Sequence, residues 1–287
     1  MIIQTDNYLK DFVIWAIYRI HYGTDFLKES IRSIIHDVDK IFIFYSEKPW
    51  VTTDYINYKN KKIPFPKNPE NVKSFLKKNF INDKIIIDNY ECTTPKNQFG
   101  ELYKISCNKL KKKPKQVLFL EPDMIIGKNQ LKIFKFELKM KFWLDCIIAR
   151  QIEIWKYNKF DKNNNSYRIS LRKNRVGPVL WKIKDNENIE TNFGGEPLKQ
   201  KKKFSNFVYI LNLGFSFNKE TMFYKHLTAL TFSKKIGDSI PDENWYDDKW
   251  LNWSKDIENL EISKGSQHLI KRAFKYKIPY KYFQFLI

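Results

Sequence analysis

The residues best suited to chemistry are two carboxylates, Glu121 and Asp123, at the end of the segment Gln116-Val-Leu-Phe-Leu-Glu-Pro-Asp. An unpaired buried carboxylate is costly, so two of them at the end of an apolar strand favour a bound cation. Carboxylate oxygens suit Mg²⁺ or Mn²⁺, and substrate phosphates often complete the shell of such ions. The pattern therefore predicts a metal–diphosphate site. The structural alternative is that both side chains cap the following turn and helix.

The elements that must position this pair form an alternation of strands and helices. Such an order is typical of parallel strands joined by crossover helices. The predicted strands cover 12–18, 40–45, 84–88 and 116–120, and the predicted helices cover 26–35, 71–79 and 99–110. Ligands of open α/β sheets bind outside the carboxyl ends of the strands, which is where Glu121 and Asp123 are expected.

The pattern changes after Asp123. In chain order, we expect a helix over 129–142, a long strand over 146–157, a hairpin of 167–171 with 179–183, a strand over 207–211, and helices over 219–236, 244–254 and 267–275. Earlier in the chain, a polar loop that contains Pro49 and Pro64 is expected between the second strand and the second helix. The predicted fold class is therefore α/β, an open sheet with flanking helices and a helical C-terminal region.

The formal charge of +20 comes from 52 Lys and Arg residues against 32 Asp and Glu residues. A polyanionic partner would explain this excess, but so would AT-rich coding, which favours the abundant Lys, Asn, Ile, Phe and Tyr. Lys also far outnumbers Arg, the residue that reads phosphates and bases in bidentate fashion. We therefore expect no nucleic-acid partner.

The three cysteines, Cys92, Cys107 and Cys146, are odd in number and widely spaced. They fit neither a disulfide framework nor a zinc ribbon, and a reducing compartment is the simplest setting for them. The apolar run near the start is too short to span a bilayer and does not resemble a signal peptide. We expect a cytoplasmic protein, either free or at the membrane surface.

Four segments resemble the GT-A fold of nucleotide-sugar glycosyltransferases and are family 2-like. Residues 18–35 resemble the first strand, loop and helix of that fold, and residues 41–46 resemble its second strand. Asn97-Gln98-Phe99-Gly100 opens a helix as the helix before the family's motif does. Residues 117–126 resemble the motif strand, with Glu-Pro-Asp in place of Asp-x-Asp. The resemblance implies a GT-A-like, Rossmann-type open mixed sheet.

The resemblance also implies a division of labour within one domain. Residues 1–127 would form the Rossmann-like half that binds the nucleotide sugar, and residues 128–287 the acceptor-binding half. Asp123 would bind the metal ion, and Glu121 the ion or the ribose. The other implied roles are nucleoside binding by Ala16, Tyr18 and Ser46, phosphate or ribose binding by Asn97 and Gln98, and metal binding by His226. A lone histidine on an apolar helix also has a structural interpretation.

An inverting enzyme of this kind needs a carboxylate base near the acceptor hydroxyl. The segment 241–250 mixes carboxylates with aromatic residues, as sugar sites often do, and supplies Asp247 and Asp248. A capped amphipathic helix would explain the same pattern. Glu153 is a further candidate, because strand alternation places it on one face with Gln151 and Trp155.

The sequence therefore predicts a metal-dependent glycosyltransferase of the hexosyltransferase type that uses Mn²⁺ or Mg²⁺. The ion would neutralise the charge that develops on the departing diphosphate. The favoured donor is a UDP-sugar, and the acceptor is a glycan, a lipid-linked molecule or a protein. Peripheral membrane association stays open, although no amphipathic anchor stands out. Two alternatives remain: a metal-dependent nucleic-acid-processing enzyme, and a non-catalytic carbohydrate-binding module on the same scaffold.

Overall fold

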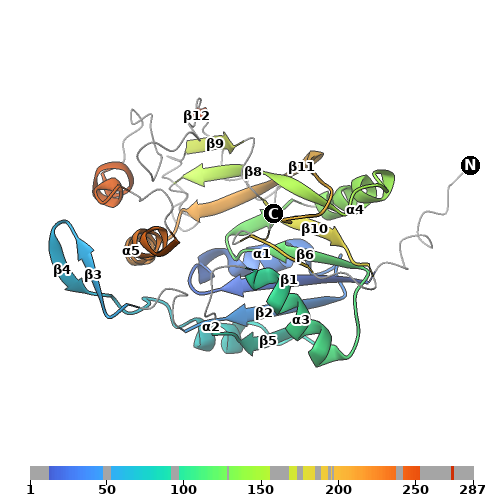
Figure 1. Cartoon of the computed structure of the whole chain (residues 1–287), viewed down its shortest axis with the longest axis horizontal. Coiled ribbons are helices and arrows are strands. Elements are labelled where there is room, and N and C mark those ends of the chain that lie inside the picture. The colour runs from blue at the N-terminus through green and yellow to red at the C-terminus, as the bar shows by residue number, and fades with distance from the viewer. Residues whose placement is uncertain are drawn as a thin grey trace, which may run out of the picture.

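A computed structural model describes residues 13–47, 53–91, 97–127, 129–155, 168–172, 177–184, 189–192, 195, 197–236, 242–252 and 273–274. Ten strands of this part of the chain form one mixed sheet (Figure 1). They are β1 (Ile14–Ile20), β2 (Lys40–Tyr45), β5 (Ile85–Asn89), β6 (Gln116–Leu120), β7 (Met124–Ile126), β8 (Cys146–Trp155), β9 (Arg168–Arg172), β10 (Val179–Lys182), β11 (Lys202–Phe215) and β12 (Ala273–Phe274). Their order is β12-β9-β8-β10-β6-β1-β2-β5, and β11 pairs with both β7 and β8.

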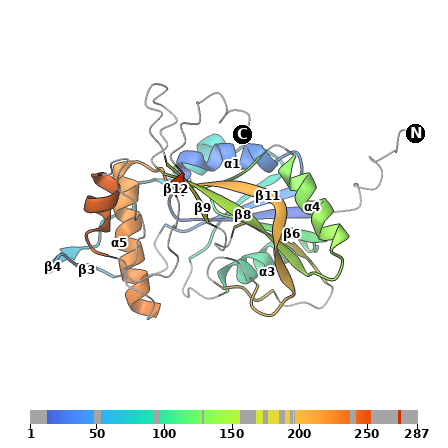
Figure 2. The same ribbon diagram turned by 90° about the horizontal axis from the view of Figure 1, so that it is seen from above.

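The central strands β6, β1, β2 and β5 run parallel, as the alternation of strands and helices predicts. The helices that join them are α1 (Leu27–Ile34), which follows a short 3₁₀ turn, α2 (Val72–Asn79) and α3 (Gln98–Leu110). Alternate side chains of each strand face opposite layers. Ala16 packs in the core under α1 and α2, whereas Trp15 packs in the core under α3. Figure 2 shows α1 and α3 on opposite sides of the sheet. The predicted α/β class with an open mixed sheet is confirmed.

The second half extends the same sheet. Strand β10 pairs antiparallel with β6 and with the first part of β8, at 146–148, and β9 pairs antiparallel with the later part of β8, at 151–155. The predicted hairpin of 167–171 with 179–183 is therefore wrong. The reason is visible in Val179, Leu180 and Trp181, which are buried on both faces and so occupy the interior of the sheet. Strand β11 is much longer than the predicted 207–211, because it pairs with β8 from Lys202 to Phe215 and also with β7 over 210–212.

A hairpin replaces part of the polar loop that the prolines predict. Strands β3 (Tyr55–Tyr58) and β4 (Lys61–Pro64) pair antiparallel around Lys59 and Asn60, which have φ values of 51° and 61°. Positive φ at both central residues is typical of a tight hairpin turn. Ile56 packs on Leu227 and Leu230 of α5 (Lys219–Ile236). This contact with a distant helix explains why sequence pattern alone does not predict the hairpin.

The helical elements of the second half match their predictions unevenly. Helix α4 (Gln130–Met140) and helix α5 lie where the spacing predicts them, and residues 246–251 form a π-helix, η2 (Tyr246–Leu251), instead of a longer α-helix. Most of the expected helix over 267–275 lies outside the described residues, and the two that are described, 273 and 274, form strand β12. None of the described helices has the length and apolar character needed to cross a membrane.

Candidate functional site

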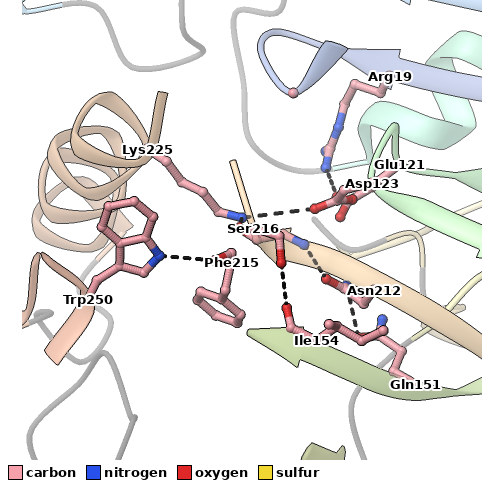
Figure 3. A network of polar contacts seen from close by, with 12 residues as sticks. Arg19, Glu121, Asp123, Gln151, Ile154, Asn212, Phe215, Ser216, Lys225 and Trp250 are labelled. Carbon is pink, nitrogen blue, oxygen red and sulfur yellow. Dashed lines mark hydrogen bonds and ion pairs between the residues drawn. The ribbon is translucent and has the colours of Figure 1, made fainter. Parts of the chain in front are cut away.

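The carboxyl ends of the parallel strands carry the candidate site (Figure 3). Tyr18 of β1 lies beside Leu120 of β6, so the residues that follow these two strands emerge at one edge of the sheet. Glu121 and Asp123 follow β6 directly. The backbone N–H of Leu213 donates to the carbonyl of Asp123 at 2.9 Å, which fastens this turn to β11.

Glu121 is paired with a cation that the chain itself supplies. Arg19, near the end of β1, donates to Glu121 Oε1 at 2.8 Å and to Gln98 Oε1 at 2.7 Å. Its guanidinium also lies over the Phe99 ring, 4.8 Å from the centroid. Only 9% of the Arg19 side chain is exposed. Sequence reasoning missed Arg19; the available signal was a charged residue inside an otherwise apolar strand.

Asp123 faces a second internal cation. The ammonium of Lys225 on α5 lies 4.0 Å from Asp123 Oδ2 and donates to the Gly214 carbonyl at 2.7 Å. The same ammonium lies 5.3 Å from the Phe215 ring centroid and 5.1 Å from that of Phe217. Figure 3 shows Lys225 reaching from α5 towards Asp123. Asp123 is buried and 23% of the Lys225 side chain is exposed, so the pair is partly shielded from solvent.

Gly214 is required for this close approach. A Cβ at this position would lie 2.5 Å from Asp123 Oδ2, 2.8 Å from Lys225 Nζ and 3.0 Å from Asn212 Oδ1. The Gly214 N–H donates to Asn212 Oδ1 at 2.9 Å, and Asn212 Nδ2 donates to Gln151 Oε1 at 3.1 Å. Polar side chains from the turn after β6 and from β8, β11 and α5 therefore converge on Gly214, where there is no room for a methyl group.

Helix α5 is held at this edge by two polar contacts with the first half of the chain. His21 Nδ1 donates to the Ser46 carbonyl at 3.0 Å, and the Tyr224 hydroxyl lies 2.8 Å from His21 Nε2. Thr221 Oγ1 donates to Glu70 Oε1 at 2.9 Å. Burial lowers the pKa of His21, although the Ser46 carbonyl and nearby carboxylates partly oppose this shift. A neutral His21 has one donor and one acceptor nitrogen, which matches these two partners.

Two of the predicted nucleoside-binding residues lie in the core. The side chains of Ala16 and Tyr18 are fully buried, and the Tyr18 hydroxyl is 2.9 Å from Ser30 Oγ. Burial raises the pKa of Tyr18. Ser46 follows β2 at the edge of the sheet, where its hydroxyl donates to Glu91 Oε2 at 3.3 Å. Of these three residues, Ser46 is therefore the one whose side chain lies near the strand ends.

Asn97 and Gln98 begin helix α3 beside the motif. The Asn97 backbone has a φ of 55°, and its side chain accepts from the Thr191 N–H at 2.9 Å. The Asn97 N–H donates in return to the Thr191 carbonyl at 3.2 Å. Gln98 is fully buried and is linked to Glu121 through Arg19. The structure thus brings Gln98, Glu121 and Asp123 to one edge of the sheet, while the roles expected for them stay predictions.

His226 lies in a different cluster, between α5 and η2. Its Nε2 donates to the Glu243 carbonyl at 3.2 Å, and its ring lies 5.5 Å from that of Trp245. Within the described residues, its buried Nδ1 has no hydrogen-bond partner. Burial lowers the pKa of His226, opposed by the Glu243 carbonyl and by neighbouring carboxylates. No contact joins His226 to Asp123 or Glu121 among the interactions described.

The three predicted bases lie on β8 and η2. Asp247 pairs with Lys59 and accepts from the Tyr58 hydroxyl at 3.3 Å, whereas Asp248 is exposed. Glu153 lies opposite Asn212 in the β8–β11 pairing, and its side chain falls outside the described residues. In the part of the chain that the structure describes, no group of three or more His, Cys, Asp or Glu side chains is placed to hold a metal ion.

No protein-family model matches the sequence, and no curated protein matches it. Several solved structures are similar in fold. One is GalNAc-T7 with UDP, GalNAc and Mn²⁺, at 11% identity and a TM-score of 0.40, with 78% of this chain and 51% of that chain covered. Another is S. aureus TarS 1–349 with UDP-GlcNAc, at 10% identity and a TM-score of 0.41, covering 84% and 72%. A third is 4-diphosphocytidyl-2C-methyl-D-erythritol synthase from Anaerococcus prevotii DSM 20548, at 12% identity and a TM-score of 0.38, covering 75% and 96%.

The chain spans 51% of the GalNAc-T7 structure. At these identities the likeness concerns the arrangement of strands and helices and extends to no particular side chain.

Proposed function

We propose that this protein is a glycosyltransferase of the hexosyltransferase type, which moves a sugar from a nucleotide diphosphate donor to an acceptor hydroxyl. The observation that carries the proposal is the pair of buried Asp123 with Lys225, beside the Arg19–Glu121 pair at the carboxyl edge of the parallel strands. Ligands of open α/β sheets bind at this edge. Charged groups already fixed there stabilise a developing diphosphate charge without reorganising during the reaction.

A divalent ion fits this edge with Asp123 as its protein ligand. The observation that supports the fit is the Asp123 carboxylate itself, a hard oxygen donor buried at the carboxyl edge of the strands, where Gly214 places no Cβ against its Oδ2. When bound, Mn²⁺ or Mg²⁺ would supply positive charge for the departing diphosphate. Glu121 is engaged by Arg19 and His226 lies in another cluster, so donor oxygens and water would provide the remaining ligands.

The cationic side chains have separate tasks in this proposal. Lys225 would bind a donor phosphate oxygen with the ammonium that now lies near Asp123, and the Gly214 carbonyl would keep it at the edge. Arg19 would orient Glu121, whose side chain is 33% exposed and can accept a hydrogen bond from the ribose. Gln98 would hold Arg19 in place.

The acceptor would bind on the side of α5 and η2. Asp247, Asp248 and Glu153 remain the proposed candidates for the base that removes the proton from the acceptor hydroxyl. Asp247 is held by Lys59 and Tyr58, whereas Asp248 is open to solvent and to an acceptor. We propose a UDP-sugar as the donor, a glycan, a lipid-linked molecule or a protein as the acceptor, and the cytoplasm as the location.

Thermal unfolding with UDP-, GDP-, CMP- and dTDP-sugars, with and without Mn²⁺, tests this proposal, because a ligand that binds only the native state raises Tm. We expect one nucleotide diphosphate sugar to raise Tm, more so with Mn²⁺. Asp123→Asn should abolish the shift, and Asp83→Asn, which alters an exposed carboxylate elsewhere, should preserve it. The absence of a shift with every nucleotide would contradict the proposal.

Release of the nucleoside diphosphate from the donor that binds is the second measurement. Turnover with an added acceptor separates a transferase from a carbohydrate-binding module, which would bind the sugar without releasing the nucleotide. Steeply salt-dependent binding to DNA or RNA, in place of binding to sugar nucleotides, would instead favour a nucleic-acid-processing enzyme.

A further inference from the structure

Large hydrophobic side chains are exposed at one place in particular. Seven of the ten that are exposed among the described residues lie on α4, on the turn after it and on β11. They are Ile133, Phe136, Met140, Phe142, Trp143, Phe207 and Tyr209, and we call this set the α4–β11 patch. Soluble proteins rarely expose so many large apolar side chains together, and such surfaces mark interaction sites.

The members of the patch form one continuous surface. Ile133, Phe136 and Met140 follow one another at helical spacings of three and four residues and so lie on one stripe of α4. The Phe142 and Trp143 rings, whose centroids are 5.3 Å apart, extend this stripe past the helix end.

Strand β11 lies against the same side of α4. The Tyr209 N–H lies 3.4 Å from Gln130 Oε1, and Glu137 accepts from Ser205 Oγ and from the Asn206 N–H, the latter at 3.0 Å. These contacts place Phe207 and Tyr209 next to the stripe. Figure 2 shows α4 beside β11, with α5 at the other end of the molecule.

The charge around the patch is positive. Exposed lysines flank it on α4 and at the start of β11: Lys132, Lys139, Lys201, Lys202 and Lys203. The two nearest carboxylates are already paired, Glu137 with Lys141 and Asp145 with Lys184. Asp37 and Asp39 act on Lys135, at the side of α4 away from the stripe.

We propose that the α4–β11 patch docks the protein on an anionic lipid bilayer. Aromatic and aliphatic side chains enter the boundary between headgroups and acyl chains, and flanking lysines bind the anionic headgroups. A second copy of the chain fits less well, because a symmetric contact through this patch would bring lysines against lysines. The proposal is independent of the proposed reaction, and docking through α4 leaves the edge beside α5 open.

Cosedimentation of the full chain with lipid vesicles tests this surface. We expect binding to vesicles that contain phosphatidylglycerol and little binding to pure phosphatidylcholine. Phe136→Ser with Phe142→Ser and Trp143→Ser should reduce binding at least tenfold. Lys132→Gln and Lys139→Gln should each reduce it roughly fivefold, since a lysine near an anionic surface contributes about that factor.

Matched controls change the same chemistry elsewhere. Ile81→Ser removes an exposed apolar side chain that is 91% accessible, and Lys77→Gln with Lys78→Gln removes two exposed charges from α2. These variants should bind vesicles as the unaltered protein does. The circular dichroism and Tm of every variant show whether it has folded.

Three outcomes would overturn the proposal. The first is equal vesicle binding by the patch variants and the controls, and the second is no binding to any vesicle. The third is sedimentation of the unaltered protein as a dimer that the triple apolar variant dissociates without any change in lipid binding, which would assign the patch to self-association.

Discussion

Arg19 and Glu121 form an ion pair at 2.8 Å although 102 residues separate them in sequence. The pair joins the end of β1 to the turn after β6, and the second hydrogen bond of Arg19 reaches Gln98 at the start of α3. One guanidinium thus ties three elements together at the edge where the candidate site lies. Two nitrogens of the planar Arg19 guanidinium donate these two hydrogen bonds, and the ammonium of a lysine lacks this forked arrangement of donors.

Arg19→Met should therefore lower the free energy of unfolding by about 1–3 kcal/mol, because it leaves Glu121 and the buried Gln98 without this donor. Arg19→Lys should recover only part of the loss, since one ammonium cannot reproduce the fork. Urea denaturation measures both changes. The double variant Arg19→Met with Glu121→Met should lose less unfolding free energy than the sum of the losses in the two single variants. If the losses are strictly additive, the ion pair contributes nothing to stability.

Gly214→Ala tests the crowding around Asp123. The added methyl group would meet Asp123 Oδ2 at 2.5 Å and Lys225 Nζ at 2.8 Å, so we expect a loss of about 1–3 kcal/mol in unfolding free energy. Nucleotide-dependent stabilisation should fall as well. Because Lys225 is the flexible member of this contact, adding Lys225→Met should relieve part of the penalty. A Gly214→Ala protein of unchanged stability would mean that the edge is more open than described.

Stability should fall in mild acid because of His21. Burial lowers the pKa of His21 in the folded state, whereas the unfolded chain has a histidine pKa of about 6.5. The unfolded state therefore binds the proton more readily. The contribution of neutral His21 to the free energy of unfolding is therefore fully present above about pH 6.5, and it is lost as the pH falls towards the lower folded-state pKa. His226 shifts in the same direction and adds to the effect.

Urea denaturation at about pH 7.5 and about pH 5.5, on either side of the unfolded histidine pKa, measures this loss. At the higher pH, His21→Gln should have a lower free energy of unfolding than the unaltered protein. Between the higher and the lower pH, its free energy of unfolding should fall by less. His36 is exposed, so His36→Gln is the control and should keep the full pH dependence. A His21→Gln protein with an unchanged pH profile would place the effect elsewhere.

Glu137 should fix the position of α4 against β11. Burial by itself raises the pKa of Glu137, but hydrogen bonds from Lys141, Ser205 and the Asn206 N–H outweigh it and lower the pKa overall. Its contribution is therefore present above the unfolded pKa of about 4.3 and is lost as the pH falls through the lower folded-state value.

Glu137→Gln should cost about 1–3 kcal/mol at neutral pH, and the difference from the unaltered protein should shrink in acid. Thermal or urea unfolding across this pH range measures the change. Glu220→Gln, at an exposed position in the first turn of α5, should change stability by no more than about 0.5 kcal/mol. A constant cost at every pH would show that the charge of Glu137 is not what matters.

The local sequence pattern was sufficient to predict the strands and helices of the parallel core. The apolar runs of β1, β2 and β6 and the helical spacing of α1 and α3 depend on neighbours in sequence, and these elements lie within a few residues of their predicted ranges. The predictions failed where a distant partner decides the outcome. Strand β10 inserts between β6 and β8, and the β3–β4 hairpin is stabilised by α5.

The sequence by itself determined that two carboxylates stand at the end of a buried strand, because strand and motif are contiguous. Only the tertiary structure decided which cations face them. Arg19 and Lys225 reach Glu121 and Asp123 through strand pairing and through the docking of α5, and no local periodicity records such long-range contacts. The same holds for the α4–β11 patch, whose halves lie far apart in the chain and become one surface only when the sheet is assembled.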